Sequence, residues 1–345
     1  MKTTAAVLTE LNQPLQILEL DLPDLHPGQV LVEMAYSGIC HTQLNEIRGK
    51  KGPDKFLPHT LGHEGSGRVV ATGAQVAKVA PGDRVVCTWL KGSGADVPSA
   101  QYFYRGAKVN SGAISTFLTN AVISENRLVV IPAGMPLREA ALLGCAIPTG
   151  VGIVRNSLQV GPGNSLAVFG AGGIGLSAIM TAAALGAGPI IAVDVFDHKL
   201  EQARSLGATH VINGKTTSAA AEIHAVVPGG VDFAIEATGS TTVMEAAFAS
   251  IKNSGQCIIA GNPAAGEKIC LDPFDLIKGK RIYGSWGGAS DPDRDIPAYV
   301  ELYLSADLPL ERLITHEFTL SEINAAFTEL EQGRVGRAIV KLEHD

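Results

Sequence analysis

The stretch Phe169-Gly170-Ala171-Gly172-Gly173-Ile174-Gly175 decides the fold of this 345-residue chain. It follows an apolar run over 165–169 and precedes an Ala-rich helical pattern over 174–185. An apolar strand, a Gly-rich turn of this spacing and a helix together form a unit that binds the pyrophosphate of a dinucleotide at the helix N-terminus. The pattern therefore predicts a βαβ unit with a cofactor at its turn.

Three of the four glycines in this turn have distinct roles. Gly170 allows the sharp turn, Gly172 lets backbone N–H groups approach the phosphates, and Gly175 lets the helix pack closely on the strand. Asp194 ends the next predicted strand, 19 positions after Gly175, where a carboxylate accepts hydrogen bonds from the adenosine ribose. Because this carboxylate would repel a 2′-phosphate, the sequence predicts NAD rather than NADP. The predicted cofactor contacts within the turn are Gly170, Gly172, Gly173, Ile174 and Gly175.

Around the turn, the region 147–286 alternates short apolar runs with helical patterns, which is typical of a doubly wound parallel sheet. Residues 1–146 instead carry short β-type runs separated by Gly and Pro, which indicates a mostly antiparallel domain. After 287, two helical patterns and a final strand over 338–342 return the chain to that first domain. We therefore predict a dinucleotide-binding domain, 147–286, inserted into a catalytic domain of 1–146 and 287–345.

Composition argues against several classes of function. A net charge of −7 and a pI of about 5.7 disfavour nucleic acid and anionic membranes as partners. No run approaches the ~18 apolar residues of a membrane helix, and the N-terminal stretch lacks a signal-peptide core. Five widely spaced cysteines, an odd number, disfavour a disulfide framework. We therefore expect a cytoplasmic protein with reduced thiols that acts on a small molecule.

Three short stretches predict a metal site: Gly38-Ile39-Cys40-His41-Thr42, Gly62-His63-Glu64-Gly65 and Leu143-Gly144-Cys145. Thiolate and imidazole are the ligands that Zn²⁺ prefers, and two Cys with one His leave the fourth tetrahedral position open for a substrate. Cys40, His63 and Cys145 are therefore predicted to bind one catalytic zinc ion.

With these motifs in place, the chain resembles the zinc-dependent alcohol dehydrogenases of the medium-chain dehydrogenase/reductase family over nearly its whole length. The Gly-His-Glu segment and the paired Cys positions are specific to the zinc members, since zinc-free quinone reductases of the family lack them. The resemblance implies an α/β fold in which a Rossmann doubly wound parallel sheet is inserted into a mostly antiparallel β (GroES-like) catalytic domain. The matching segments are 38–42, 62–67, 81–85, 144–150, 170–175 and 236–239.

The resemblance also implies roles for residues around the metal and the cofactor. Thr42 would take the alcohol proton, and Glu64 would be the acid beside the metal, either supporting it or binding it transiently. His41 would lie against the pyrophosphate of the cofactor. Three more residues are predicted cofactor contacts: Thr149, Lys199 and Arg337.

The chain departs from the resemblance in two places. Many members hold a structural zinc ion with four closely spaced cysteines, whereas the stretch 87–112 has Cys87 alone, so we expect no structural zinc. Asn45 stands where horse-liver-type relatives end a proton relay with His, and Asn has no titratable proton to pass on. The sequence therefore allows two routes for the proton to leave, one through the cofactor ribose and water and one through His41.

The remaining cysteines and histidines are interpreted as structural. Cys257 and Cys270 fall in apolar runs and are expected to be buried in strands, as is Cys87. His59 and His210 have no ligand context and are expected to be structural.

These features together predict a zinc-dependent oxidoreductase that transfers a hydride between a primary or secondary alcohol and NAD, giving an aldehyde or ketone. The polar, Tyr-containing segment 91–112 favours a polar alcohol such as a polyol or an aminocyclitol. One alternative is an enoyl or quinone reductase of the zinc-free type, which would lack the ligand set and prefer NADPH. Another is a non-catalytic nucleotide-binding relative. The resemblance further implies a homodimer or homotetramer, paired through edge strands around 268–271.

Overall fold

The computed structural model describes residues 1–344 and divides the chain into two compact units. Unit 1 comprises Met1–Cys145 together with the segment from Asp291 to the C-terminus, and unit 2 comprises Ala146–Ser290. Among the described residues no single helix has the length and hydropathy needed to cross a membrane. One bent pair, Leu137–Gly144 with Ala146–Ser157, meets that test only when its two parts are combined.

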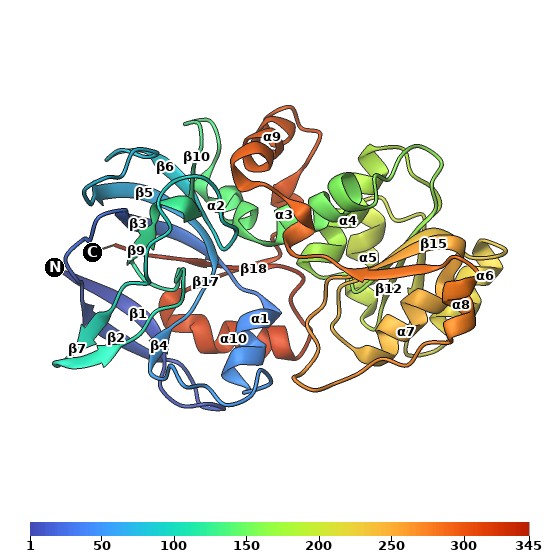
Figure 1. Ribbon diagram of the computed structural model, residues 1–345, viewed down its shortest axis with the longest axis horizontal. Helices are drawn as coiled ribbons and strands as arrows, with labels where there is room; N and C mark the ends of the chain where they lie inside the picture. Colours follow the sequence, from blue (N-terminus) through green and yellow to red (C-terminus); the bar gives the residue numbers. More distant parts are fainter. Residues whose placement is uncertain (345) are drawn as a thin grey trace. The chain divides into compact units, whose positions relative to one another are not determined.

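Unit 1 is built on two β-sheets around one hydrophobic core (Figure 1). The first sheet is antiparallel, with the strand order β4-β1-β2-β7-β8. Its strands are β1 (Lys2–Leu8), β2 (Gln16–Asp21), β4 (His59–Thr60), β7 (Tyr102–Tyr104) and β8 (Ala107–Val109).

The second sheet of unit 1 has the order β10-β6-β5-β3-β18-β17, with β9 also paired to β3. Only its β17–β18 pair is parallel. Its strands are β3 (Gln29–Gly38), β5 (Glu64–Thr72), β6 (Arg84–Thr88), β9 (Asn120–Ser124), β10 (Leu128–Val130), β17 (His316–Thr319) and β18 (Ala338–Lys341).

Helices connect and cover these sheets. They are α1 (His41–Ile47), η1 (Glu125–Arg127), α2 (Leu137–Ala140), η2 (Ala141–Gly144), α9 (Pro292–Leu304), η5 (Leu310–Arg312), η6 (Leu320–Glu322) and α10 (Ile323–Glu331). The C-terminal strand β18 pairs with β3, in the register Ile339 opposite Gly38. This pairing returns the tail of the chain to the second sheet of unit 1 and so makes unit 2 an insertion.

Unit 2 contains one parallel sheet of six strands in the order β13-β12-β11-β14-β15-β16 (Figure 1). The strands are β11 (Leu166–Phe169), β12 (Ile190–Asp194), β13 (His210–Asn213), β14 (Val231–Glu236), β15 (Ile251–Ile259) and β16 (Arg281–Gly284). Its helices are α3 (Ala146–Gly152), η3 (Ile153–Ser157), α4 (Gly173–Ala184), α5 (Asp197–Ser205), α6 (Ala219–Val226), α7 (Thr241–Ser250), α8 (Pro273–Ile277) and η4 (Gly287–Ala289).

The strand order reverses between β11 and β14, which is the point where doubly wound sheets bind dinucleotides. The four residues of β11 are at most 1% exposed, as expected for a central strand covered on both faces. The predicted fold class, a parallel Rossmann sheet inserted into a GroES-like β domain, is therefore confirmed.

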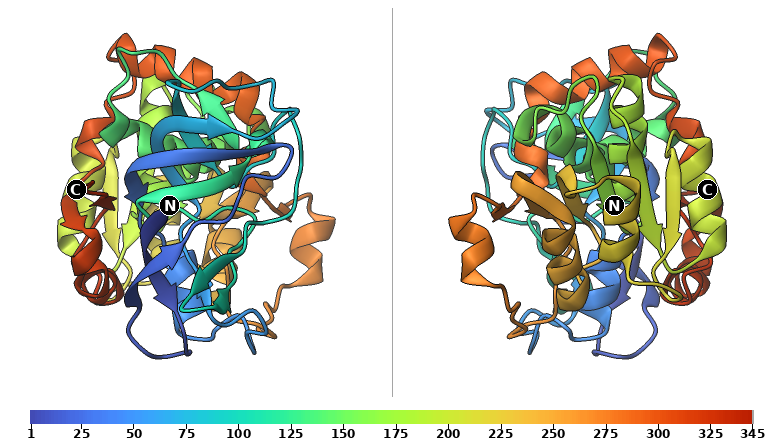
Figure 2. Two further views of the ribbon diagram at one scale, coloured as in Figure 1. Left: turned by 90° about the vertical axis from the view of Figure 1, so that its left-hand side faces the viewer. Right: turned by 90° about the vertical axis from the view of Figure 1, so that its right-hand side faces the viewer.

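One expectation about the edge of this sheet is wrong. Cys270 is exposed, and residues 269–271 form no strand. The Cys270 N–H donates a hydrogen bond to Glu245 Oε1 at 2.8 Å. The edge strand is β16 instead, since β15 supplies a parallel partner for 281–284 and none for 268–271. Figure 2 shows the short helix α8 standing away from the sheet between these two segments. Cys257 and Cys87 are buried, as predicted.

Candidate active site

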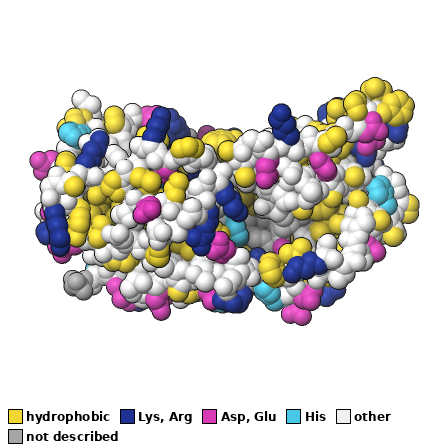
Figure 3. Space-filling view, turned by 90° about the horizontal axis from the view of Figure 1, so that it is seen from below, with side chains coloured by type: hydrophobic (Ala, Val, Ile, Leu, Met, Phe, Trp, Pro, Cys, Tyr) yellow, Lys and Arg dark blue, Asp and Glu magenta, His cyan; other side chains and the backbone are white. Residues whose placement is uncertain are grey.

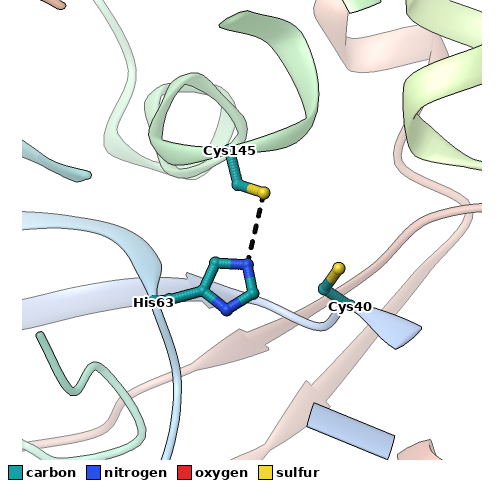
Figure 4. A group of neighbouring side chains, drawn as sticks. All are labelled: Cys40, His63 and Cys145. Carbon is teal, nitrogen blue, oxygen red and sulfur yellow. Dashed lines mark hydrogen bonds between the residues drawn. The ribbon is translucent and has the colours of Figure 1, made fainter. Parts of the chain in front are cut away.

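Three side chains of unit 1 converge although they come from distant parts of the chain. The sulfur atoms of Cys40 and Cys145 and a ring nitrogen of His63 all lie within 4.8 Å of one another (Figure 4). The Nε2 atom of His63 lies 3.2 Å from the Sγ atom of Cys145. Two thiolates at tetrahedral positions around zinc are separated by about 3.8 Å, given Zn–S distances of about 2.3 Å. The spacing and the donor set therefore fit a zinc ion.

Local structure positions each of these ligands. Cys40 directly precedes α1, and Cys145 directly follows η2. His63 follows Gly62, whose φ of +93° lies in the left-handed region and whose hypothetical Cβ would be 2.3 Å from Thr116 Oγ1. Gly62 is thus required for the turn that delivers His63 to the start of β5.

The electrostatics of the three groups also favour a cation. Hydrogen bonding with Cys145 lowers the pKa of the Cys40 thiol well below its ordinary value, and the same contact raises the pKa of Cys145. Burial lowers the pKa of His63, but its contact with Cys40 outweighs burial and leaves that pKa raised. A divalent cation bound between the two sulfurs and the ring would take the place of their protons.

Gln43 belongs to this centre and was missed by sequence reasoning. Its side chain is 1% exposed, its Oε1 accepts a hydrogen bond from Cys40 N at 3.1 Å, and its Nε2 contacts Nδ1 of His63. The available signal was its position three residues after Cys40, which places it at the third position of the helix that Cys40 caps.

Glu64 and Arg337 form a buried ion pair directly beside His63. The Arg337 Nη2 atom contacts Glu64 Oε1, and Nη1 donates to Ile39 O at 2.7 Å. Burial raises the pKa of Glu64, and the Arg337 guanidinium opposes that rise. The structure therefore places Arg337, a predicted cofactor contact, against the acid beside the ligand set.

Thr42 is half-buried, with its Oγ1 atom 3.6 Å from Cys40 Sγ. The structure thus brings its hydroxyl next to the ligand set. His41 is exposed at the start of α1, and Asn45 is half-buried one turn further along.

The Gly-rich turn of unit 2 has the predicted form. Gly170 has a φ of +96°, and a Cβ on Gly175 would lie 1.9 Å from the Gly170 carbonyl oxygen. Helix α4 has Gly172 as its N-cap, and Gly173 and Ile174 are its first two residues. The backbone of this turn therefore meets the requirements of a helix N-terminus that receives phosphates.

Asp194 is bound to this turn from the end of β12. Its Oδ2 accepts a hydrogen bond from Ala171 N at 2.7 Å, and its Oδ1 accepts from Val195 N and Phe196 N at 2.7 and 3.1 Å. Lys199 is buried one turn into α5, with its Nζ 5.1 Å from the centre of the Phe196 ring, and burial lowers its pKa. Asp194 and Lys199 thus lie on consecutive elements beyond the Gly-rich turn, while Thr149 is buried in α3.

A second group with metal-binding chemistry is Glu46, Asp54 and His59 in unit 1. The His59 Nε2 atom lies 2.8 Å from Asp54 Oδ2, and its Nδ1 lies 3.1 Å from the Thr60 carbonyl oxygen. Both ring nitrogens thus have protein partners, in keeping with the structural role expected for His59. His210, in β13, is exposed.

Comparison with known proteins agrees with this geometry. Residues 26–133 match the alcohol dehydrogenase GroES-like domain, and residues 173–305 match the zinc-binding dehydrogenase domain. The S-(hydroxymethyl)glutathione dehydrogenase of Synechocystis sp. is 33% identical, in an alignment that covers 99% of this chain and 100% of the relative. The chain belongs to the zinc-dependent alcohol dehydrogenases of the medium-chain dehydrogenase/reductase family. The predicted family is thereby confirmed.

Solved structures of zinc-type dehydrogenases share the fold. An alcohol dehydrogenase zinc-binding domain protein from Burkholderia ambifaria has a TM-score of 0.92 and 34% identity, with both chains covered in full. Benzyl alcohol dehydrogenase from Acinetobacter calcoaceticus has a TM-score of 0.91 and 32% identity, covering 99% of this chain and 100% of that one. This member of the family therefore shares its two-domain fold with solved zinc-type alcohol dehydrogenases.

Proposed function

We propose that this alcohol dehydrogenase uses one zinc ion per chain, held by Cys40, His63 and Cys145, to transfer a hydride between an alcohol and NAD. The observation that carries the proposal is the convergence of two sulfurs and one imidazole nitrogen within 4.8 Å in an open donor set. Three protein ligands leave one tetrahedral position for substrate, whereas a structural site would use four.

The chemistry is divided between the metal and the side chains. Zinc bound there supplies a Lewis acid for the alcohol or carbonyl oxygen. The Thr42 hydroxyl oxygen lies 3.6 Å from Cys40 Sγ. From this position it would accept the proton of the alcohol and pass it on. Glu64 and Arg337 form a buried pair beside His63 and would keep that side of the site rigid.

The position of Asp194 supports NAD as the cofactor. Three backbone N–H groups fix its carboxylate, including that of Ala171 within the Gly-rich turn. A fixed negative charge there would accept hydrogen bonds from ribose hydroxyls and repel a 2′-phosphate. Lys199 and Lys215, whose Nζ atoms lie 5.1 and 4.9 Å from the Phe196 ring centre, are the nearby groups that would favour a phosphate. The test of cofactor use must therefore include NADP.

We also propose that the chain has no structural zinc, because hydrogen bonds secure the segment where relatives place it. The Glu125 carboxylate accepts from Ala77 N and Lys78 N at 2.6 Å each and from Ala95 N at 2.8 Å. Cys87, the one cysteine of 87–112, is buried in β6, and burial raises its pKa, which disfavours the thiolate that zinc requires.

A reducing compartment suits this chemistry, because zinc binds thiolates and disulfides would remove them. None of the five cysteines forms a disulfide within residues 1–344. The cytoplasm is therefore the compartment we propose.

The experiment is a spectrophotometric screen for NADH or NADPH production over a panel of alcohols. The panel spans aliphatic and aromatic alcohols, polyols, aminocyclitols and S-(hydroxymethyl)glutathione, because relatives in the same family act on different alcohols. Polar alcohols with NAD should be favoured, given the polar segment 91–112. No turnover with any alcohol of the panel, at full zinc loading, would overturn the proposed activity.

Two matched pairs of variants link that activity to the site. Cys40→Ser should abolish turnover, while Cys270→Ser, at an exposed cysteine outside the centre, should not change it. Thr42→Val should reduce kcat about 100-fold, the usual scale of a positioned proton acceptor, whereas Thr42→Ser keeps a hydroxyl and should retain most activity. Equal kcat values for the valine and serine variants would contradict the role given to Thr42.

We further propose that two copies pair through the β16 edge of unit 2. Strand β16 ends the sheet, and Figure 3 shows hydrophobic side chains gathered at the upper right of the face drawn. An unpaired strand edge flanked by apolar surface favours pairing with an identical edge across a two-fold axis. Acidic and basic residues both lie beside it in the sequence, including Asp272, Asp275, Lys278 and Lys280, so opposite charges could face each other across such an axis. Exposed apolar residues at this edge are Phe274, Leu276, Ile277, Tyr283 and Trp286.

Light scattering coupled to gel filtration tests this pairing. Ile277→Asp, at a side chain 76% exposed, should convert the oligomer to smaller species. Leu304→Asp in α9 introduces the same charge at an exposed leucine of unit 1 and should leave the mass unchanged. A monomeric wild-type chain, or an Ile277→Asp variant of unchanged mass, would contradict the proposal.

A further inference from the structure

The buried amide of Gln43 joins two of the proposed zinc ligands. Its Oε1 accepts from the Cys40 backbone N–H at 3.1 Å, and its Nε2 meets the Nδ1 atom of His63. The other ring nitrogen of His63, Nε2, faces the Cys145 sulfur at 3.2 Å and is the atom that would bind the metal. Gln43 is 1% exposed, so bulk solvent does not reach it.

Metal binding changes the hydrogen-bonding group that His63 presents to this amide. A neutral imidazole that binds a metal through Nε2 carries its proton on Nδ1, so Nδ1 becomes a donor. Residue 43 then faces two donors, Nδ1–H of His63 and the N–H of Cys40. The Gln43 amide offers one acceptor oxygen and one donor NH2 group, whereas a carboxylate at the same position offers an acceptor oxygen to each donor.

We infer that Gln43 is a positioning residue that limits the zinc affinity of this centre, because with metal bound its amide must either face the Nδ1–H group with its own NH2 group or share one oxygen between two donors. The inference rests on the proposed zinc site and concerns how tightly this chain holds the ion. It gives the centre a more readily exchanged metal than a carboxylate at residue 43 would give.

Charge acts in the same direction. A zinc ion, two thiolates and a neutral imidazole sum to zero, and the neutral Gln43 leaves that sum unchanged. The neighbouring Glu64 is already paired with Arg337. A carboxylate at residue 43 would add one negative charge in contact with His63 and would strengthen the attraction for the cation. Glutamate has nearly the shape of glutamine, so Gln43→Glu tests both effects without a change in packing.

The experiment measures the zinc dissociation constant of metal-stripped protein by competition with a chromophoric chelator. Gln43→Glu should bind zinc about 10-fold more tightly, and Gln43→Met, which removes both hydrogen-bonding groups, about 10-fold more weakly, the scale usual for partners of metal-bound histidines. Gln13→Glu makes the same charge change at an exposed residue of unit 1 and should leave the constant unchanged.

Nitrogen NMR of His63 supplies a readout that is independent of activity. In metal-stripped wild type, Nδ1 should show the shift of an acceptor nitrogen, and on zinc addition it should gain a proton while the Gln43 side-chain amide resonances move. Cobalt-loaded protein should report the same ligand set by its thiolate charge-transfer absorption in wild type and in both variants.

The outcomes separate the two proposals. Zinc that binds wild type and Gln43→Glu with equal affinity overturns this inference and leaves the zinc site standing. Zinc that binds neither protein overturns both. If Gln43→Met fails to fold, the comparison of Gln43→Glu with wild type and Gln13→Glu decides alone.

Discussion

Replacing Arg337 with methionine should destabilise unit 1 by leaving a carboxyl group buried without its partner. Glu64 is completely buried, its Oε1 contacts Arg337, and its Oε2 has no hydrogen-bond partner among residues 1–344. Breaking a buried pair in this way costs about 3–5 kcal/mol, because one charge stays in a medium that solvates it poorly.

Protonation sets an upper limit on this loss. Glu64 can escape the penalty by taking up a proton, which at pH 7 costs about 3.7 kcal/mol for a carboxyl with an ordinary pKa of about 4.3. The folded variant then binds a proton that the unfolded chain does not, so its deficit in stability grows with rising pH by about 1.4 kcal/mol per unit. We therefore expect a loss of about 3–4 kcal/mol at pH 7 and about 1 kcal/mol at pH 5.

The chain has two tryptophans, Trp89 in unit 1 and Trp286 in unit 2, which allows the units to be followed separately. Guanidinium unfolding read from Trp89 fluorescence, in a Trp286→Phe background, gives the free energy of unfolding of unit 1. Arg334→Met is the control, because Arg334 pairs with Glu329 at the surface, where such a pair contributes about 0–1 kcal/mol. A loss below about 1 kcal/mol for Arg337→Met at pH 7, or an equal loss at pH 5 and pH 7, would refute the reasoning.

Two further predictions concern the cofactor turn and the segment near Ala95. Asp194→Ser should weaken NADH binding about 10-fold, since a hydrogen bond to a charged group contributes about 1.5–3 kcal/mol. The ratio of NADH affinity to NADPH affinity, measured by cofactor fluorescence, should also fall. An unchanged ratio would contradict the role of Asp194. Glu125→Gln should cost about 2 kcal/mol at pH 7, because the carboxylate serves three backbone N–H groups. Burial raises the pKa of Glu125, but those hydrogen bonds outweigh it and hold the pKa below its usual range, so this stability is lost as the pH falls through that lowered value. Hydrogen exchange at the backbone amides of Ala77, Lys78 and Ala95 should be faster in the variant. Unchanged exchange rates would contradict the role given to the Glu125 carboxylate.

Local patterns in the sequence were sufficient for much of the fold. The turn at 169–175 could be predicted from its own residues, since Gly170 needs a positive φ and Gly175 has no room for a Cβ. The convergence of Cys40, His63 and Cys145 came from the chemistry of the residues and from the family resemblance. Spacing alone could not have shown it, because the three lie on separate loops.

Long-range partners were beyond the reach of sequence patterns. Arg337 meets Glu64 across 273 positions, and that meeting depends on the register between β18 and β3. In the sequence, Gln43 resembles an ordinary polar residue of a short helix, because no neighbouring residue indicates its contact with His63. The apolar run around Cys270 suggested a strand, yet a strand needs a neighbouring partner, and 281–284 occupies the place beside β15.

The central claim is that two sulfurs and one imidazole hold a single catalytic zinc ion. Metal analysis of purified chain, dialysed after exposure to excess zinc, tests it most directly alongside Cys40→Ser and Cys270→Ser. We predict one zinc ion per chain in wild type and in Cys270→Ser and none in Cys40→Ser. Wild-type protein without zinc, or zinc retained in full by Cys40→Ser, would contradict the claim.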